Sequence, residues 1–178
     1  MVEQNRCVIL DGHAIMYRAY HAFKDLSDPT GTPINAVYGF SRILLKSIDD
    51  FNPRYLAVAF DHRKGKSKRL EQYENYKAQR PQMPDDLIVQ VDLIKEVVRA
   101  FAIPQFELEN FEADDILGTI ARKLGDDNSV LTTIITGDKD LLQLVVDGST
   151  TVFIPGRGKF SKDVEYTSEK VVQKMGVL

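Results

Sequence analysis

The sequence of 178 residues lacks tryptophan and contains a single cysteine, Cys7. One thiol cannot form a disulfide within the chain or a cysteine zinc site, which excludes a disulfide-stabilised scaffold. No apolar run approaches the roughly 18 residues that a membrane-spanning helix needs. The N-terminal residues are typical of a strand rather than of a signal peptide. We therefore expect a protein of the reducing cytoplasm that does not contact a membrane.

A large excess of charge of one sign is also missing, because the formal net charge is only -3. The distribution of charge is nevertheless uneven. Residues 63–80 carry seven basic and two acidic side chains, which gives this segment a net charge of +5. Residues 107–115 carry five acids and no base. Such segments create local fields that an evenly mixed surface lacks, and both are therefore candidate functional regions.

Short apolar runs alternate with helical patterns along the chain, and the length fits a single domain. Strands that are apolar throughout and separated by helices form parallel sheets that are covered on both faces. The sequence therefore predicts an α/β fold. Its expected strands cover residues 7–10, 55–60, 105–108, 130–135 and 150–154, and its expected helices cover residues 34–51, 84–102, 111–124 and 168–175.

Acidic residues follow several of the expected strands. Three strands end at or next to an aspartate, one expected helix begins with an acidic cluster, and a further aspartate lies two residues beyond the last of the three. The carboxyl ends of parallel strands meet at one edge of a sheet. We therefore expect seven carboxylates to converge there: Asp11, Asp61, Glu112, Asp114, Asp115, Asp138 and Asp140.

These acids have two interpretations. A single aspartate after a strand usually forms a turn or caps a helix, and the helix dipole favours acids in a first turn. Seven carboxylates together, however, repel one another unless cations neutralise them. Oxygen ligands suit Mg²⁺ or Mn²⁺, and no histidine or cysteine spacing indicates zinc. The set predicts two divalent ions that cleave phosphodiesters, with all seven acids as candidate catalytic and metal-binding residues.

The basic segment offers a matching surface for nucleic acid. It lacks an apolar stripe, so it is expected to stand away from the core, and lysine and arginine bind phosphate backbones. Tyr73 and Tyr76 lie among the basic residues and could stack on bases. The alternative is a solvated helix face. His13 follows Asp11-Gly12, and we expect it to cap a helix or to pack rather than to bond a carboxylate. We also expect Gly39 to let DNA approach the helix at residues 34–51.

Four strings, ILDGHAIMYRAYHAF, VAFDH, FEADDILGTIA and ITGDKDLLQLV, resemble the 5′→3′ exonuclease domain of bacterial DNA polymerase I, a family of structure-specific flap nucleases. The resemblance covers nearly the whole chain. It implies a three-layer PIN-like fold with a mostly parallel sheet and a protruding helical arch at about residues 62–84. It also implies that Asp11, Glu112 and Asp114 serve the first ion, and that Asp138 and Asp140 bridge or approach the second.

The same resemblance implies where DNA is held. Lys68 stands where the family commonly has an aromatic residue, which puts the stacking of a base at the arch in doubt but not the cleavage chemistry. Family members continue into a helix-hairpin-helix-like DNA-binding region that is absent here, so residues 1–178 are expected to be an N-terminal lobe only. The candidate DNA contacts are Tyr17, Arg18, Arg69, Tyr76, Lys77, Arg80 and Lys139.

We expect a metal-dependent 5′→3′ exonuclease and 5′-flap endonuclease that acts on DNA with a free 5′ end during replication and repair. The resemblance further implies a monomer that is associated with the nucleoid. It is also compatible with a covalently linked polymerase region in the natural protein. Three alternatives stay open: a PIN-type ribonuclease, a phosphotransfer domain, and a DNA-binding lobe that is inert by itself. The arch-like segment argues against the ribonuclease, and the lack of a second Asp after Asp11-Gly-His argues against phosphotransfer.

Overall fold

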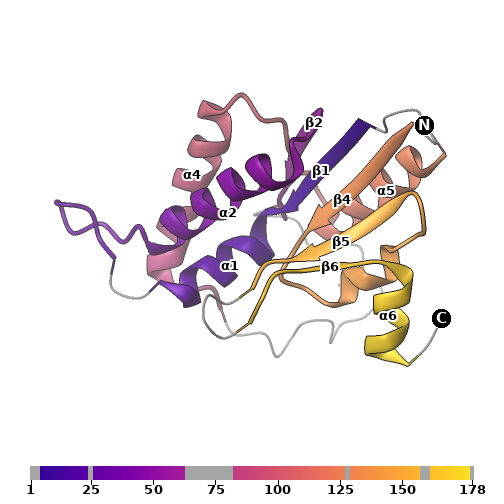
Figure 1. The fold of residues 1–178 in the computed structure, drawn as a ribbon. Coiled ribbons are helices and arrows are strands. Elements are labelled where there is room, and N and C mark those ends of the chain that lie inside the picture. Colours follow the sequence, from indigo (N-terminus) through magenta and orange to yellow (C-terminus); the bar gives the residue numbers. More distant parts are fainter. Residues whose placement is uncertain (1–4, 24–25, 63–81, 127–128, 157–160, 177–178) are drawn as a thin grey trace.

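The centre of the molecule is a sheet of six strands in the order β3-β2-β1-β4-β5-β6 (Figure 1). This computed structural model describes residues 5–23, 26–62, 82–126, 129–156 and 161–176. The strands are β1 (Asn5–Asp11), β2 (Tyr55–Ala59), β3 (Gln105–Phe106), β4 (Val130–Ile135), β5 (Thr150–Ile154) and β6 (Val164–Tyr166).

The first five strands pair in parallel, as the sequence predicts, and β6 pairs antiparallel with β5. β6 has only three residues, so no apolar run predicts it. The central strand β1 has β2 on one side and β4 on the other. The chain therefore builds the sheet outward in both directions from β1. In open α/β sheets this reversal places the ligand site at the carboxyl ends of the central strands.

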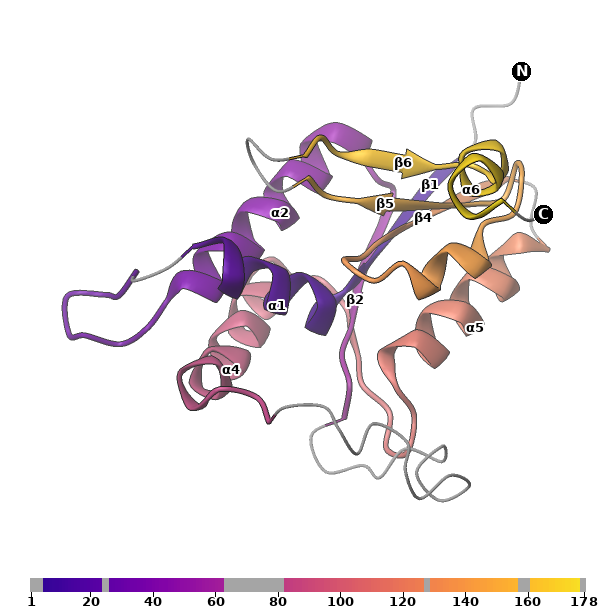
Figure 2. The same cartoon turned by 90° about the horizontal axis from the view of Figure 1, so that it is seen from below.

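Helices cover both faces of the sheet, which confirms the predicted fold class (Figure 2). On one face lie α1 (Gly12–Ala22), α2 (Asn35–Phe51) and α4 (Asp85–Ala100), and on the other lies α5 (Ala113–Gly125). The short 3-10 helix η1 (Asp140–Leu144) and α6 (Ser168–Met175) lie on the α5 side. Among the described residues, no helix is both long and apolar enough to cross a bilayer.

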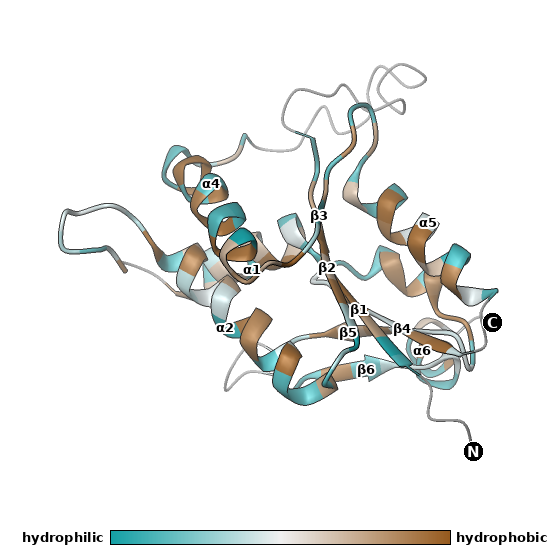
Figure 3. Cartoon of the chain, turned by 90° about the horizontal axis from the view of Figure 1, so that it is seen from above, coloured by the Kyte–Doolittle hydropathy of each residue, from teal (hydrophilic) through white to brown (hydrophobic). Residues whose placement is uncertain are grey.

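Alternating residues of β1 supply two hydrophobic cores. Val8 and Leu10 pack toward α1, α2 and α4, whereas Cys7 and Ile9 pack toward α5. In Figure 3 the central strands are hydrophobic along most of their length, whereas the helices carry both kinds of residue. Full burial of one such aliphatic side chain contributes about 1.5–3 kcal/mol. Cys7 is 6% exposed, and burial raises the pKa of its thiol to about 11.

The two helices α1 and α2 touch at Gly39. This residue is buried, and a Cβ atom added there would lie 2.7 Å from the Cβ of Ala19. The absence of a side chain therefore lets α2 pack closely on α1. The expectation that Gly39 allows DNA to approach a helix is wrong, because the surface of α1 already covers it.

A buried glutamine attaches α4 to the start of α2. Gln90 is fully buried, and its Oε1 accepts the backbone N–H of Ala36 at 2.8 Å. Its Nε2 donates to Asn35 Oδ1 at 2.9 Å. The residue that caps α2, Ile34, has no side-chain hydrogen bond to the helix. Gln90 thus supplies, from a different helix, an acceptor for the unpaired N–H groups that begin α2.

Candidate metal and nucleic-acid site

Asp11 occupies the point where β1 ends and α1 begins. It is 3% exposed. Its Oδ1 accepts the backbone N–H of Ala14 at 3.0 Å, which caps α1, and its Oδ2 accepts the hydroxyl of Thr136 at 2.8 Å. Both oxygens of this carboxylate are therefore held in place, one by the helix that follows β1 and one by the end of β4.

The surroundings of Asp11 disfavour its charge. Burial raises the pKa of this carboxyl to about 7, against the opposing hydrogen bonds from Ala14 and Thr136. The negative charges of Asp114 and Asp61 raise the pKa further. Acids from β1, from the residues after β2 and from α5 are thus near enough to repel one another. This repulsion is what a bound cation would remove.

Asp61 is held through its main chain and its side chain. Its Oδ1 accepts the backbone N–H of Ala113 at 2.7 Å, and its own backbone N–H donates to His13 Nδ1 at 3.0 Å. The same Nδ1 lies 3.9 Å from Asp61 Oδ2. Because this nitrogen accepts a hydrogen bond, the geometry describes a neutral imidazole rather than an ion pair. His13 therefore holds the backbone of Asp61, and its ring packs edge-on against Phe60, which confirms the expected packing role.

Glu112 and Asp115 form a capping box at the start of α5. The carboxylate of Asp115 accepts the backbone N–H of Glu112 at 3.0 Å, and the Glu112 side chain accepts the backbone N–H of Asp115. Such a pair satisfies two N–H groups that a helix start leaves unpaired. Glu112 and Asp115 therefore do cap the helix start, as one of the two interpretations of the sequence has it. Asp114 lies between them in the sequence, and its charge raises the pKa of Asp11.

The loop after β4 carries the remaining acids. The backbone N–H of Asp138 donates to the hydroxyl of Thr136 at 3.0 Å, and Asp138 Oδ1 accepts the backbone N–H of Asp140 at 2.9 Å. Turns of this kind are typical of threonine and aspartate side chains. Asp140 and Lys139 are exposed. This loop thus places a half-buried acid, an exposed acid and an exposed base at the same sheet edge as Asp11.

The acids share this edge without forming a finished ligand set. Within the described parts of the chain, no three histidine, cysteine, aspartate or glutamate side chains are grouped so that they could hold one metal ion. The donor atoms nevertheless fit a hard divalent cation, since they are carboxylate oxygens around a buried, mutually repelling centre. The assignment of seven metal ligands stays a prediction.

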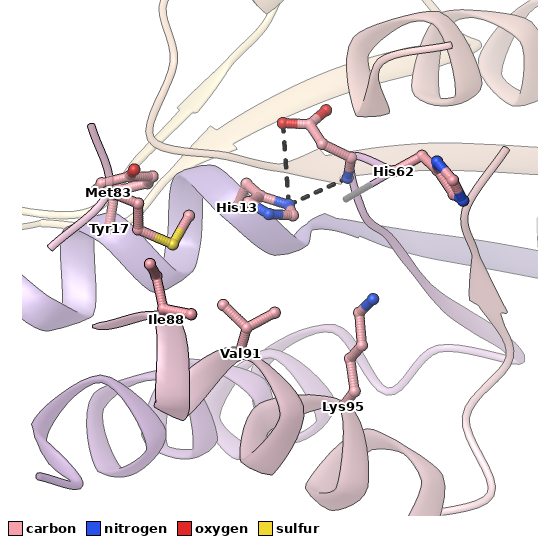
Figure 4. Close-up of a pocket in the computed structure, with 8 residues that line it drawn as sticks. His13, Tyr17, His62, Met83, Ile88, Val91 and Lys95 are labelled. Atoms are coloured by element: carbon pink, nitrogen blue, oxygen red, sulfur yellow. Dashed lines mark hydrogen bonds and ion pairs between the residues drawn. The ribbon is translucent and has the colours of Figure 1, made fainter. Parts of the chain in front are cut away.

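A cavity of about 360 Å³ lies beside Asp61, between α1 and α4 (Figure 4). One wall is apolar and includes Ile88 and Val91 of α4, from which Lys95 also projects. Lys95 forms an ion pair with Glu107 and lies 5.3 Å from the centre of the Phe60 ring. The lining residues are His13, Tyr17, Asp61, His62, Met83, Ile88, Val91 and Lys95.

The candidate DNA contacts divide into two groups. Of those that the structure describes, Tyr17 lines the cavity and Lys139 is exposed. The guanidinium of Arg18 donates to the carbonyl of Pro155, so part of its hydrogen-bonding capacity is used within the protein. The others, and most of the predicted arch at 62–84, lie outside the described residues: Arg69, Tyr76, Lys77 and Arg80.

Two residues at the site were not predicted to have the contacts that the structure shows. Thr136 bonds both Asp11 and Asp138, and His13 bonds the backbone of Asp61. The one feature of the sequence that could have indicated a role for Thr136 is its position directly between an apolar strand and Gly137-Asp138. Its contact with Asp11 depends on the neighbour relation of β1 and β4, which a single sequence does not contain.

A mostly parallel sheet covered by helices on both faces, with acids at the carboxyl ends of its central strands, defines a PIN-like α/β fold. The particular family follows from the sequence. The family model described as "5'-3' exonuclease, N-terminal resolvase-like domain" matches residues 6–176, and the chain belongs to this family.

Two relatives illustrate the similarity. DNA polymerase I of Caldicellulosiruptor bescii is 44% identical over 174 residues, which are 97% of this chain and 20% of that protein. The 5'-3' exonuclease of Aquifex aeolicus is 41% identical over 169 residues, which are 95% of this chain and 56% of that protein. The chain thus spans about a fifth of the polymerase and somewhat more than half of the exonuclease.

Solved structures of the bacteriophage T5 D15 protein share the fold. One, co-crystallised with metal ions, has a TM-score of 0.76 and 20% identity, and the match covers 97% of this chain and 62% of the phage chain. Another, of the D15 flap endonuclease in a pseudo-enzyme-product complex with DNA and metal ions, has a TM-score of 0.71, 19% identity and coverages of 97% and 61%. At this identity the likeness shows the fold.

Proposed function

We propose that the chain is the metal-dependent catalytic part of a 5′→3′ exonuclease and 5′-flap endonuclease that hydrolyses DNA phosphodiester bonds. The observation that carries the proposal is the Asp11 carboxylate. It is buried at the carboxyl edge of the central strand, and the charges of Asp61 and Asp114 oppose its ionisation. A protein gains nothing in stability from such a centre without a cation. Membership of the exonuclease family supports the same activity.

The proposed ions are two Mg²⁺ or Mn²⁺ ions. Asp11, Glu112 and Asp114 would hold the first, and Asp138 and Asp140 the second, with Asp61 and Asp115 completing the set. When bound, the ions supply a water of lowered pKa and neutralise charge on the attacked phosphate and on the leaving 3′ oxygen. The T5 structures with metal ions support ions at this fold, although they do not identify them for this chain.

The protein's own residues would orient these components. Ala14 and Thr136 fix the plane of the Asp11 carboxylate, and His13 with Ala113 fixes Asp61. The cavity beside Asp61 has apolar side chains and the Tyr17 ring, a suitable surface for an unpaired base of the 5′ strand. Lys139 would contact a phosphate from the other side of the acids.

Further parts of the proposal concern the natural protein. We place residues 1–178 as an N-terminal nuclease lobe, with a polymerase region linked to it as in the polymerase relatives. Duplex DNA would be gripped mainly by a helix-hairpin-helix-like region outside this sequence. Arg18, Arg69, Tyr76, Lys77 and Arg80 would add contacts to the 5′ strand. We further propose a cytoplasmic, nucleoid-associated monomer.

The activity can be tested with labelled substrates. The chain is incubated with Mn²⁺ and a 5′-flap DNA, a blunt duplex or a single-stranded RNA, and each reaction is repeated in EDTA. We expect Mn²⁺-dependent cleavage of the flap DNA, with a 5′-phosphate on the product. Asp11→Asn combined with Asp114→Asn is the inactive control, and calorimetry should show that this double variant has lost Mn²⁺ binding.

Three results would contradict the proposal in different ways. Preferential cleavage of the RNA would identify a PIN-type ribonuclease. Mn²⁺ binding without cleavage of any substrate would identify a lobe that is inert by itself. Mn²⁺ binding that is unchanged in the double variant would show that the metal lies elsewhere.

A further inference from the structure

Thr136 is fully buried at the end of β4, directly before the turn that carries Asp138. β4 runs beside β1 with Leu10 opposite Ile135, which brings the next residues, Asp11 and Thr136, side by side. We propose that Thr136 is a positioning residue that couples the Asp11 carboxylate to the Asp138–Asp140 turn. Acids from two strands thereby act as one divalent-cation site. This inference rests on the proposed function.

The directions of the two hydrogen bonds at Thr136 are fixed by chemistry. A hydroxyl carries one proton and can accept at its oxygen. The backbone N–H of Asp138 can only donate, so the hydroxyl oxygen accepts there, at 3.0 Å. The single proton of Thr136 then goes to Oδ2 of ionised Asp11, at 2.8 Å. One small group thus satisfies a donor of the turn and an acceptor of the buried acid at the same time.

At Asp11 the consequence is a fixed carboxylate plane. Ala14 holds Oδ1 and Thr136 holds Oδ2, so the group cannot rotate without leaving a buried oxygen unpaired. Each carboxylate oxygen can accept more than one partner, and capacity for a cation therefore remains. Without the Thr136 hydroxyl, Oδ2 would lose its anchor and the carboxylate would be held at Oδ1 alone.

At the turn the consequence is a fixed path for the backbone. The hydroxyl of Thr136 sets the position of the Asp138 N–H, and Asp138 Oδ1 in turn accepts the N–H of Asp140 at 2.9 Å. The backbone N–H of Thr136 donates to the carbonyl of Phe153 in β5 at 3.1 Å, so the sheet holds Thr136 itself. The positions of Asp138 and Asp140 relative to Asp11 therefore depend on the side chain of Thr136.

The same strand contains matched controls. The side chain of Thr132 lies on the same face of β4 and is fully buried, and among the described residues its Oγ1 has no hydrogen-bond partner. Thr133 is buried too, but its hydroxyl pairs with that of Thr151 at 3.1 Å. Neither hydroxyl contacts a site acid. A threonine-to-valine change at Thr132 thus makes the same substitution on the same face of the strand without touching the site.

The test measures Mn²⁺ affinity by calorimetry on the whole chain, for the wild type and for Thr136→Val, Thr136→Ser and Thr132→Val. Outer groups that orient metal ligands change metal affinity by about 10- to 100-fold, and we expect a loss of this size in Thr136→Val. Thr136→Ser restores the hydroxyl and should stay within about threefold of the wild type, and Thr132→Val should bind as the wild type does. Thermal unfolding in EDTA checks that each variant folds.

A second measurement separates positioning from a general structural effect. If Thr136 acts through the acids of the turn, Thr136→Val should weaken Mn²⁺ binding less in an Asp138→Asn background than in the wild type. Groups that act independently would instead give additive losses. The Mn²⁺ concentration for half-maximal cleavage of flap DNA should rise in Thr136→Val, while the KM for DNA stays unchanged.

Equal Mn²⁺ affinity of Thr136→Val and Thr132→Val, or additive losses in the double variant, would overturn the inference. If Thr136→Val does not fold, Thr136→Ala compared with Thr136→Ser provides the same contrast without the added methyl group. A wild-type chain that binds no Mn²⁺ would overturn the proposed function as well. Wild-type binding with an unaffected Thr136→Val would overturn this inference alone.

Discussion

The carboxyl edge of the sheet holds its acids in two different ways. Asp11 is buried, and both of its oxygens accept hydrogen bonds from separate elements, α1 and β4. Asp140 is exposed where the loop after β4 enters η1, and its backbone N–H donates to Asp138. The side chain is thus fixed by tertiary structure in the first case, and in the second the local turn fixes the backbone.

The two acids therefore differ in how freely their side chains can move and in how much their charge costs. The carboxylate of Asp11 already has a fixed orientation, but its burial and the nearby charges of Asp61 and Asp114 make its ionisation costly without a cation. An exposed acid is solvated and costs little to keep charged. We infer that the buried half of the edge defines where the first ion binds, and that the exposed half adapts to the second ion and the substrate.

The largest expected effect is on cleavage. Asp11→Asn should slow Mn²⁺-dependent cleavage of a 5′-flap DNA by about 10³-fold, the upper range for losing one fixed electrostatic group. Asp140→Asn should slow it by about 10- to 100-fold, because a solvated neighbour can take over part of its task. Single-turnover rates at saturating DNA measure both. Equal losses of cleavage rate in Asp11→Asn and Asp140→Asn would contradict the distinction between the buried and the exposed acids of the edge.

The next effect is on stability in EDTA. The pKa of Asp11 is raised to about 7 from an ordinary 3.8, so its contribution to stability is present below pH 4 and is lost as the pH rises through 7. Asp11→Asn does not titrate and should gain stability relative to the wild type over this window. The gain is at most on the order of 4 kcal/mol above pH 7.

Thermal unfolding of both proteins at several pH values between 4 and 8 measures this difference. Asp140→Asn is the control and should show no comparable gain over the same window. In Mn²⁺ the order should reverse, because the ion stabilises the folded wild type by mass action. A constant difference between Asp11→Asn and the wild type at all pH values would show that the pKa of Asp11 is not raised in the folded protein.

The smallest effect concerns the exposed base between the loop acids. Lys139→Ala should lower the affinity for flap DNA a few-fold and reduce the slope of log affinity against log salt by about one. Lys123→Ala is the matched control, because Lys123 is exposed near the end of α5, which leads to the opposite edge of the sheet. Filter binding at several salt concentrations gives the slopes. Identical slopes for the two variants would leave Lys139 as a solvated base.

The parts of the structure that a sequence predicts are the local ones. Apolar runs such as 130–135 and 150–154 coincide with β4 and β5, and the aspartates at the strand ends lie at the predicted edge. Sheet order is a non-local property, since it depends on which strands pair. The contact between Asp11 and Thr136 follows from the pairing of β1 with β4, and no pattern within either segment contains it.

The helix-start acids show a second limit. The string at Glu112 to Asp115 is compatible both with a capping box and with metal ligands, and the structure shows the capping box. The two uses draw on the same oxygens, so residue type and spacing cannot separate them. His13 differs, because its hydrogen bond to Asp61 is with a backbone N–H, a group that every residue but proline carries and that no motif can mark.

The buried thiol in β1 has a practical consequence for anyone who follows this protein by fluorescence. Thiol reagents attack the thiolate, and Cys7 is both covered and held in its protonated form, so it should not react while the protein is folded. The chain also has no tryptophan to add background emission. A single cysteine introduced at an exposed position such as Asp147 could therefore carry a dye at one defined place, with the native chain otherwise unaltered.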